Sequence, residues 1–218
     1  NGERIRIMGD GAAGNGALRN IRGTNEIQGT LPLQTFFGQG TVFAPPAAPR
    51  LQVIRNPLVP TWFAVAFTSA ASRIGVQPDE APYDQFHWSQ LTVSGVISGA
   101  ASLVKVGTGE LVLADVANTY SGQTFIRQGW VTVRNDRSLG AGVNFPDTIS
   151  PETYVGEGAG LVLKRTRAGA NPITVPERVF ASGDGFTHRD GSIANSFPEL
   201  NHNGAILNLS GNAAYSPA

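Results

Sequence analysis

The sequence predicts an all-β fold built from short strands that stack on one another, and three observations support this prediction. Apolar residues recur at every second position in short runs, the spacing that places side chains on one face of a strand. Glycines separate these runs, where the chain must turn sharply. No stretch shows a convincing 3.6-residue period, so helix should be scarce.

Residues 91–140 show the pattern most clearly. The alternating apolar positions are Leu91, Val93, Leu103, Leu111, Leu113, Phe125, Val131 and Val133. The glycines between the runs are Gly95, Gly99, Gly107, Gly109, Gly122 and Gly129. Each run has about three to six residues, close to the lower end of strand lengths. Strands this short cannot bury a face alone, so they must stack.

The composition supports this class and excludes others. The 218 residues include 27 glycines and 14 prolines, and 41% are hydrophobic while 15% are charged. Such a chain is too apolar for disorder and too rich in glycine for a helical protein. The net charge is zero and only Lys105 and Lys164 are lysines, which argues against nucleic acid as a partner.

Two further classes of feature are absent from the sequence. There is no cysteine, which excludes disulfides, thiolate nucleophiles and cysteine-based zinc sites. No run of about 18 apolar residues is present, so we expect no transmembrane segment in this stretch. The first residue is not methionine, and we expect residues 1–218 to be one solenoid segment of a longer chain.

The first informative segment, residues 15–33, has a near copy near the end of the chain. Residues 203–212 repeat its Asn-Gly-Ala start, its second asparagine and its later glycine. Gly16 and Gly204 are 188 positions apart, far more than the 20–50 residues of one solenoid coil. We interpret the echo as a higher-order repeat of several coils; chance similarity in a glycine- and asparagine-rich chain is the alternative.

Residues 41–90 have a different character. Prolines interrupt the pattern repeatedly, and proline cannot donate to a strand ladder. We expect an irregular insertion or side module, with one buried strand around Phe63, Val65 and Phe67. An aromatic group within it suggests either a carbohydrate-binding surface or a loop that buries its rings against the solenoid, and the second interpretation is favoured: Tyr83, Phe86, His87 and Trp88.

The strand pattern resumes after a turn at residues 135–140. Residues 153–164 alternate again between apolar positions and glycine, and residues 173–175 and 178–180 are expected to be further strands. Asn118 and Asn208 are assigned to turns, where an asparagine side chain can bond its own backbone.

Several strings within residues 91–140 resemble the autotransporter-associated β-strand repeat of bacterial surface proteins. They are Gly-Val-Ile-Ser-Gly from position 95, Leu-Val-Lys-Val-Gly-Thr-Gly-Glu-Leu-Val-Leu from 103, Asn-Thr-Tyr-Ser-Gly-Gln-Thr-Phe-Ile from 118 and Ser-Leu-Gly from 138. The resemblance implies a right-handed parallel β-helix, or β-solenoid, exported to the bacterial cell surface or released from it. Residues 41–90 depart from the pattern.

With coils of about 20–25 residues, the implied solenoid would have roughly nine or ten coils and a length of about 45 Å. Leu103, Leu111 and Leu113 would point inward, and Lys105 and Glu110 would lie on the outer surface. No catalytic residue belongs to the repeat, so none is carried over to this chain.

Candidates for metal chemistry are weak. The three histidines, His87, His188 and His202, lack the close spacing of a zinc motif. Residues 184–191 contain two Asp-Gly pairs that suggest a calcium loop, but they lack the nonapeptide pattern and the terminal glutamate of known loops. Two ordinary turns explain them better, and no metal or cofactor is predicted.

Candidates for catalysis are equally weak. The acidic residues of interest show no regular coil spacing that would pair them for polysaccharide cleavage: Asp79, Glu80, Asp84, Glu152 and Glu157. Asn208-Leu-Ser fits a glycosylation acceptor, which matters only in a eukaryotic source. We predict no catalytic, cofactor-binding or metal-binding residue, and the sequence does not identify a ligand-binding one.

The predicted function is structural. The chain is expected to be an extracellular, adhesin-like segment that builds a rigid stalk or fibre at the bacterial surface, not an enzyme. A β-helix that binds or cleaves polysaccharide is the alternative. The partners considered are other copies, joined end to end or laterally, and a host surface or polysaccharide; unpaired strand edges at the ends of a solenoid favour association.

Overall fold

The structure is a computed structural model. It describes residues 5, 7–21, 23–28, 31–34, 71–76, 89–114, 117–141, 152–165, 173–187, 201–209 and 213–215. Within these ranges the single helical element is a 3₁₀ turn, η1 (Ala12–Gly14), and all other regular structure is strand. A helix long and apolar enough to cross a membrane does not occur in them.

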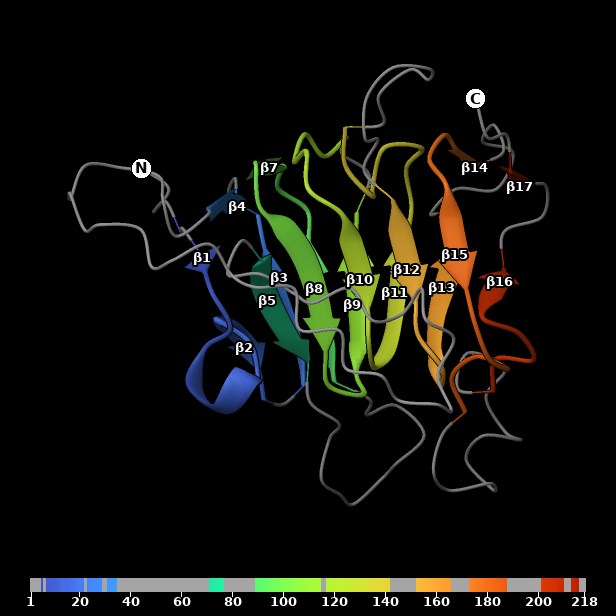
Figure 1. Ribbon diagram of the computed structural model, residues 1–218, viewed down its shortest axis with the longest axis horizontal. Helices are drawn as coiled ribbons and strands as arrows, with labels where there is room; N and C mark the ends of the chain where they lie inside the picture. The colour runs from blue at the N-terminus through green and yellow to red at the C-terminus, as the bar shows by residue number, and fades with distance from the viewer. Residues whose placement is uncertain are drawn as a thin grey trace, which may run out of the picture.

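Two six-stranded parallel sheets dominate the molecule (Figure 1). Sheet 1 consists of β2 (Leu18–Asn20), β5 (Ala71–Val76), β8 (Ser102–Val106), β10 (Thr124–Ile126), β12 (Thr153–Val155) and β15 (Val179–Ala181). Sheet 2 consists of β3 (Thr24–Ile27), β6 (Gln90–Val93), β9 (Glu110–Leu113), β11 (Gly129–Val133), β13 (Ala159–Leu163) and β16 (Ile206–Asn208).

The chain visits the two sheets alternately, so each coil contributes one strand to each sheet. β2 and β3 form coil 1, and β15 and β16 form coil 6. Figure 1 shows the strands standing side by side in chain order from the blue N-terminal end to the red C-terminal end. Every pairing between the described strands is parallel, which confirms the prediction of an all-β parallel solenoid.

A third side completes the coils. It contains a sheet of β1 (Ile7–Met8), β4 (Leu31–Gln34) and β7 (Ile97–Gly99), and a pair of β14 (Ile173–Val175) and β17 (Ala213–Tyr215). Between them single backbone bonds continue the stacking: Thr119 N donates to Ile97 O at 2.8 Å, and Ala141 N donates to Tyr120 O at 3.0 Å. The molecule is therefore a three-sided stack in which each coil bonds to its neighbours.

The number of coils differs from the prediction. Leu91 pairs with Leu111 and Leu111 with Val131, so a coil here takes 20 residues, as expected. Other coils are longer: Thr24 pairs with Gln90, and Leu161 pairs with Ile206. The described residues therefore form six coils, where nine or ten were expected of the chain, and at about 4.8 Å per coil the sheets are about 24 Å deep.

Aliphatic ladders from both sheets fill the space between them. In sheet 2 the inward positions are occupied successively by Leu91, Leu111, Val131 and Leu161, all at most 3% exposed. The predicted inward positions Leu103, Leu111 and Leu113 are each 0% exposed. Phe125, another of the alternating apolar positions, lies on the outer side of sheet 1 beside Val104.

Lys105 was wrongly predicted to lie on the outer surface. It lies at an inward position in sheet 1, between Ile74 and Ile126, and it is fully buried. Its ammonium donates to the backbone oxygens of Val106 and Gly107 at 3.1 and 2.6 Å, where β8 leads into β9, and to that of Gln128 at 3.1 Å, between β10 and β11 of the next coil. Strand alternation placed Leu103 and Lys105 on one face, and these three carbonyl oxygens satisfy the buried amine.

Two buried ionisable groups predict how stability depends on pH. Burial lowers the pKa of Lys105 from 10.5 to about 7, against the influence of Glu110. Burial raises the pKa of Glu177 from 4.5 to about 8, against a hydrogen bond from Thr153. The folded chain binds more protons than the unfolded chain at Glu177 between pH 4.5 and 8, and fewer at Lys105 between pH 7 and 10.5.

Titration of Glu177 should therefore lower the free energy of unfolding as pH increases from about 4.5 to 8. Titration of Lys105 should raise the free energy of unfolding as pH increases from about 7 to 10.5. Urea unfolding at a series of pH values should show a minimum near pH 7–8. Glu177→Gln should flatten the acid limb of that profile, and Lys105→Met the alkaline limb. Unchanged limbs in both variants would show that these side chains are not buried as described.

Other local predictions can now be compared with the structure. Residues 136–139 form the expected turn, and the expected strands near 153–164, 173–175 and 178–180 are β12 to β15. Asn208 lies in strand β16 rather than in a turn. Part of the 41–90 segment is regular, because residues 71–76 contain no proline and form β5; the remainder, except Ser89 and Gln90, lies outside the described residues.

The echo between residues 15–33 and 203–212 is not a structural repeat. Gly16 and Gly204 both have positive φ and precede strands, which explains the shared Asn-Gly-Ala start. The strands that follow belong to different sheets: β2 is in sheet 1 and β16 is in sheet 2. The interpretation as a repeat of several coils was therefore wrong, and only the turn chemistry is shared.

Candidate functional site

The predicted metal and catalytic candidates do not converge. His202 is 1% exposed, while His87 and His188 lie outside the described residues. Asp184 lies in a bend between Gly183 and Gly185, both with positive φ. In the described ranges no three histidine or acidic side chains are grouped so that they could hold a metal ion.

The acidic candidates are also separate from one another. Glu152 forms an ion pair with Arg178 at 3.0 Å and accepts a hydrogen bond from Tyr154. Glu157 is exposed in a turn. Asp79, Glu80 and Asp84 lie outside the described residues, as do the aromatic group Tyr83, Phe86, His87 and Trp88 and the strand expected around residues 63–67.

The outer side of sheet 1 carries a row of aromatic rings. Phe125, Tyr154 and Phe180 occupy the same ladder position in successive coils. Their ring centroids are 5.1 Å apart in each pair, with interplanar angles of 12° and 14°. The rings therefore turn their faces toward one another, as stacked aromatic pairs do, rather than toward a sugar. This row stabilises the stack.

The network around Tyr154 is consistent with a structural role. Burial raises the pKa of Tyr154 to about 12, with contributions from its hydrogen bond to Glu152 and from the charge of that carboxylate. The phenol therefore stays protonated at neutral pH and donates to Glu152, which also pairs with Arg178. These contacts link coils 5 and 6 along one outer side.

The outer side of sheet 2 is partly covered by a strap, defined as residues 183–187 and 201–205. Its two halves are joined by an antiparallel bridge between Thr187 and Asn201. Phe186 and His202 from the strap contact Trp130, with ring centroids 4.7 and 5.5 Å from the indole. Gly160 permits this packing, because a Cβ there would lie 2.2 Å from His202 Nδ1.

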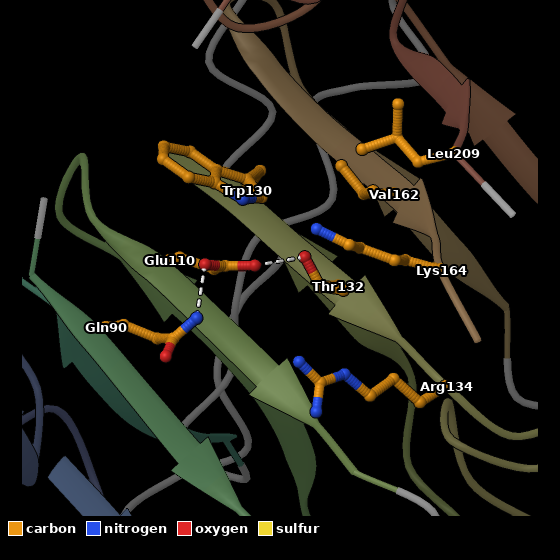
Figure 2. A pocket seen from close by; sticks show the side chains of 8 residues that line it. All are labelled: Gln90, Glu110, Trp130, Thr132, Arg134, Val162, Lys164 and Leu209. Atoms are coloured by element: carbon orange, nitrogen blue, oxygen red, sulfur yellow. Dashed lines mark hydrogen bonds between the residues drawn. The ribbon is translucent and has the colours of Figure 1, made fainter. Parts of the chain in front are cut away.

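A small hollow of about 50 Å³ lies beside the strap on the same outer side (Figure 2). Its walls come from strands β6, β9, β11 and β13 and from the residues that follow β11, β13 and β16. The lining side chains are Gln90, Glu110, Trp130, Thr132, Arg134, Val162, Lys164 and Leu209.

Glu110 forms the acidic wall of the hollow. It accepts hydrogen bonds from Gln90 Nε2 at 2.6 Å and from the hydroxyl of Thr132, which are drawn as dashed lines in Figure 2. Glu110 lies on the outer side of sheet 2, as predicted, but it is only 7% exposed. Arg134 and Lys164 face it, and Figure 2 shows both cationic ends directed into the hollow.

Comparison with known families bears on strands β8 to β11. The model of the passenger-associated-transport-repeat matches residues 103–133. Those residues are therefore similar to a passenger-associated transport repeat. No curated protein and no solved structure matches the chain. The resemblance found in the sequence is thereby confirmed over this part of the chain.

The passenger-associated transport repeat occupies coils 3 and 4, at the centre of the stack. It contains the buried Lys105, the acidic wall Glu110 and two further lining residues of the hollow, Trp130 and Thr132. The repeat indicates an autotransporter passenger region, and its family implies a secreted or surface location.

The remaining lining residues lie outside the repeat, and the sequence did not point to them. Arg134 and Lys164 are 30 positions apart and become neighbours only because Val133 pairs with Leu163. The sequence shows only that a basic residue follows the last apolar residue of two strands, as Arg134 follows Val133 and Lys164 follows Leu163. Without the register of the coils, that signal cannot be distinguished from two ordinary exposed cations.

Proposed function

We propose that the chain is a structural, adhesin-like segment of an exported passenger region, forming a rigid stalk or fibre at the bacterial cell surface. The observation that carries this proposal is the unbroken parallel pairing through six coils, with a passenger-associated transport repeat at its centre. In such an array each coil stabilises its neighbours, so length is gained without a larger core.

The contacts of the described residues support a role without catalysis. The acidic residues on the outer sides serve as hydrogen-bond and ion-pair partners, as Glu152 does for Tyr154 and Arg178. A glycosidase needs two carboxyl groups about 5–10 Å apart facing one substrate site, whereas the Glu152 carboxylate is engaged by Tyr154 and Arg178. We therefore assign the chain to architecture rather than to polysaccharide cleavage.

Surface labelling of bacteria that produce the parent protein tests the location. Antibodies raised against residues 1–218 should label intact cells, and an external protease should release a fragment that contains the solenoid. Labelling only after lysis would contradict the proposal.

An assay of the purified chain tests the alternative function. Incubation with neutral and acidic polysaccharides should release no reducing ends, and the chain should resist thermolysin below its unfolding temperature. Saturable release of reducing ends, abolished by substitution of a described carboxylate such as Glu152→Gln, would replace the structural proposal with an enzymatic one.

A further inference from the structure

The Asn-Gly pairs of the sequence echo carry a reactivity of their own. Two such pairs lie in the described residues, Asn15-Gly16 and Asn203-Gly204, and an alanine follows each of them. In an Asn-Gly pair the glycine nitrogen can attack the side-chain amide of the asparagine, because no side chain on the glycine hinders it. Asparagine is accordingly a thermolabile residue. Since the two pairs share their local sequence, the structure around each pair decides which of them reacts.

The first pair is held in place. Gly16 N donates to Asp10 O at 2.9 Å, and Asn15 N donates to Ala12 O at 3.1 Å. Gly16 is buried, and a Cβ at this position would lie 2.4 Å from Gly75 N of the next coil. A nitrogen that is bonded to an acceptor and packed against a neighbouring strand cannot turn toward the preceding side chain. We therefore expect Asn15 to be stable in the folded chain.

The second pair is open. Asn203 is exposed, and both residues lie in a bend in the second half of the strap. In the part of the chain that the structure describes, the N–H of Gly204 donates no backbone hydrogen bond. Apart from its chain neighbours, a Cβ on Gly204 would meet only one described atom, Ile206 O at 3.6 Å. The Gly204 nitrogen therefore has room to approach the Asn203 side chain.

The backbone on both sides of Asn203 is packed against the first half of the strap. His202 N donates to Phe186 O at 2.7 Å. On the other side, Gly204 O lies so near to Gly185 that a Cβ on Gly185 would be 2.2 Å from it. A backbone lengthened between these two contacts cannot keep both of them.

We propose that Asn203 is a site of spontaneous covalent modification that releases the strap from Trp130. The Gly204 nitrogen loses its proton and bonds to Cγ of Asn203, and the side-chain nitrogen leaves as ammonia after taking up a proton. Water then opens the resulting succinimide at either carbonyl, which gives aspartate or isoaspartate. The overall change is the gain of one water and the loss of one ammonia.

Isoaspartate is the product that moves the strap. It places one additional methylene in the backbone, next to the residue whose ring lies 5.5 Å from the indole of Trp130, His202. Loss of the bond from His202 N to Phe186 O then separates the two halves of the strap and uncovers Trp130 on the outer side of sheet 2. This modification is independent of the proposed structural function.

Peptide mass spectrometry tests the reaction. The folded chain is incubated at mildly alkaline pH in water enriched in oxygen-18, and the peptides that contain Asn15 and Asn203 are compared. Asn203 should take up the label several-fold faster than Asn15, and an isoaspartate methyltransferase assay should detect its product. In guanidinium chloride the two sites should react at similar rates, because Gly-Ala follows both. Equal rates in the folded chain, or no label at Asn203 there, would overturn the proposal.

Nuclear magnetic resonance and hydrogen exchange test the release of the strap. Ageing of the wild-type chain should shift the indole N–H resonance of Trp130 and accelerate exchange of the His202 amide. Aged Asn203→Gln should show neither change, since the longer side chain cyclises far more slowly. Freshly purified Asn203→Asp should also keep the strap in place, because it adds the charge without lengthening the backbone. The proposal fails if the purified isoaspartate form retains the Trp130 resonance and the His202 protection of the fresh chain, or if fresh Asn203→Asp has already lost them.

Discussion

Leu111→Asp is expected to abolish the cooperative unfolding transition of the chain. Leu111 is 0% exposed and lies in the central ladder of sheet 2, paired with Leu91 on one side and Val131 on the other. Truncation of a buried leucine to alanine costs about 2–5 kcal/mol. A buried aspartate adds the desolvation of an unpaired charge, so the total cost approaches the roughly 5–15 kcal/mol that stabilises a whole domain.

Circular dichroism during heating, together with limited thermolysin digestion, measures this effect. Leu111→Ala should retain a transition at reduced temperature, because it removes the apolar contacts without adding a charge. Thr24→Asp is the matched control, since Thr24 is exposed on the outer side of strand β3 and should change stability by no more than about 0.5 kcal/mol. A full transition and unchanged protease resistance in Leu111→Asp would show that Leu111 does not point inward.

The inward ladders were predictable because period-two alternation determines the face of a strand without knowledge of its partners. Leu103, Leu111 and Leu113 followed from this rule alone. Lys105 followed the same rule, yet its charge led to the opposite assignment. The error came from treating burial of an amine as forbidden, whereas three backbone oxygens from two neighbouring coils make it acceptable.

The number of coils and the hollow were not predictable from local pattern. A coil of 20 residues is visible from Leu91 to Val131, but the step from Thr24 to Gln90 has no local signal, since it depends on which distant strands pair. Arg134 and Lys164 likewise become neighbours only through that pairing. Long-range register, rather than residue chemistry, is the information that the sequence pattern lacked.

Asn118 illustrates the same point for a polar residue. The sequence suggested a turn asparagine that bonds its own backbone. Its side chain instead bonds two other coils: the Oδ1 atom accepts from Ile97 N at 2.8 Å, and Nδ2 donates to Ser138 O at 2.6 Å. The side chain is 2% exposed, so one amide joins coils 2, 3 and 4 inside the third side of the stack.

Asn118→Leu should therefore destabilise the chain strongly although leucine has a similar branched shape. The substitution leaves a buried N–H at Ile97 and a buried carbonyl at Ser138 without partners. Each unsatisfied group costs about 1–3 kcal/mol, so the free energy of unfolding should fall by about 2–6 kcal/mol in urea titrations. Asn135→Ala is the control, because the Asn135 side-chain oxygen accepts from Arg137 N in an exposed turn, where the loss should be about 1 kcal/mol.

Hydrogen exchange locates the effect of Asn118→Leu within the stack. The Ile97 amide belongs to coil 2, yet its acceptor is a side chain of coil 3, so its exchange should accelerate more than that of Leu91 on sheet 2 of the same coil. A uniform acceleration of both amides would indicate global destabilisation only, and protection retained at Ile97 would show that the Asn118 bond is absent. Selective loss at Ile97 would establish that a single buried amide, rather than the aliphatic ladders alone, holds the register of three successive coils.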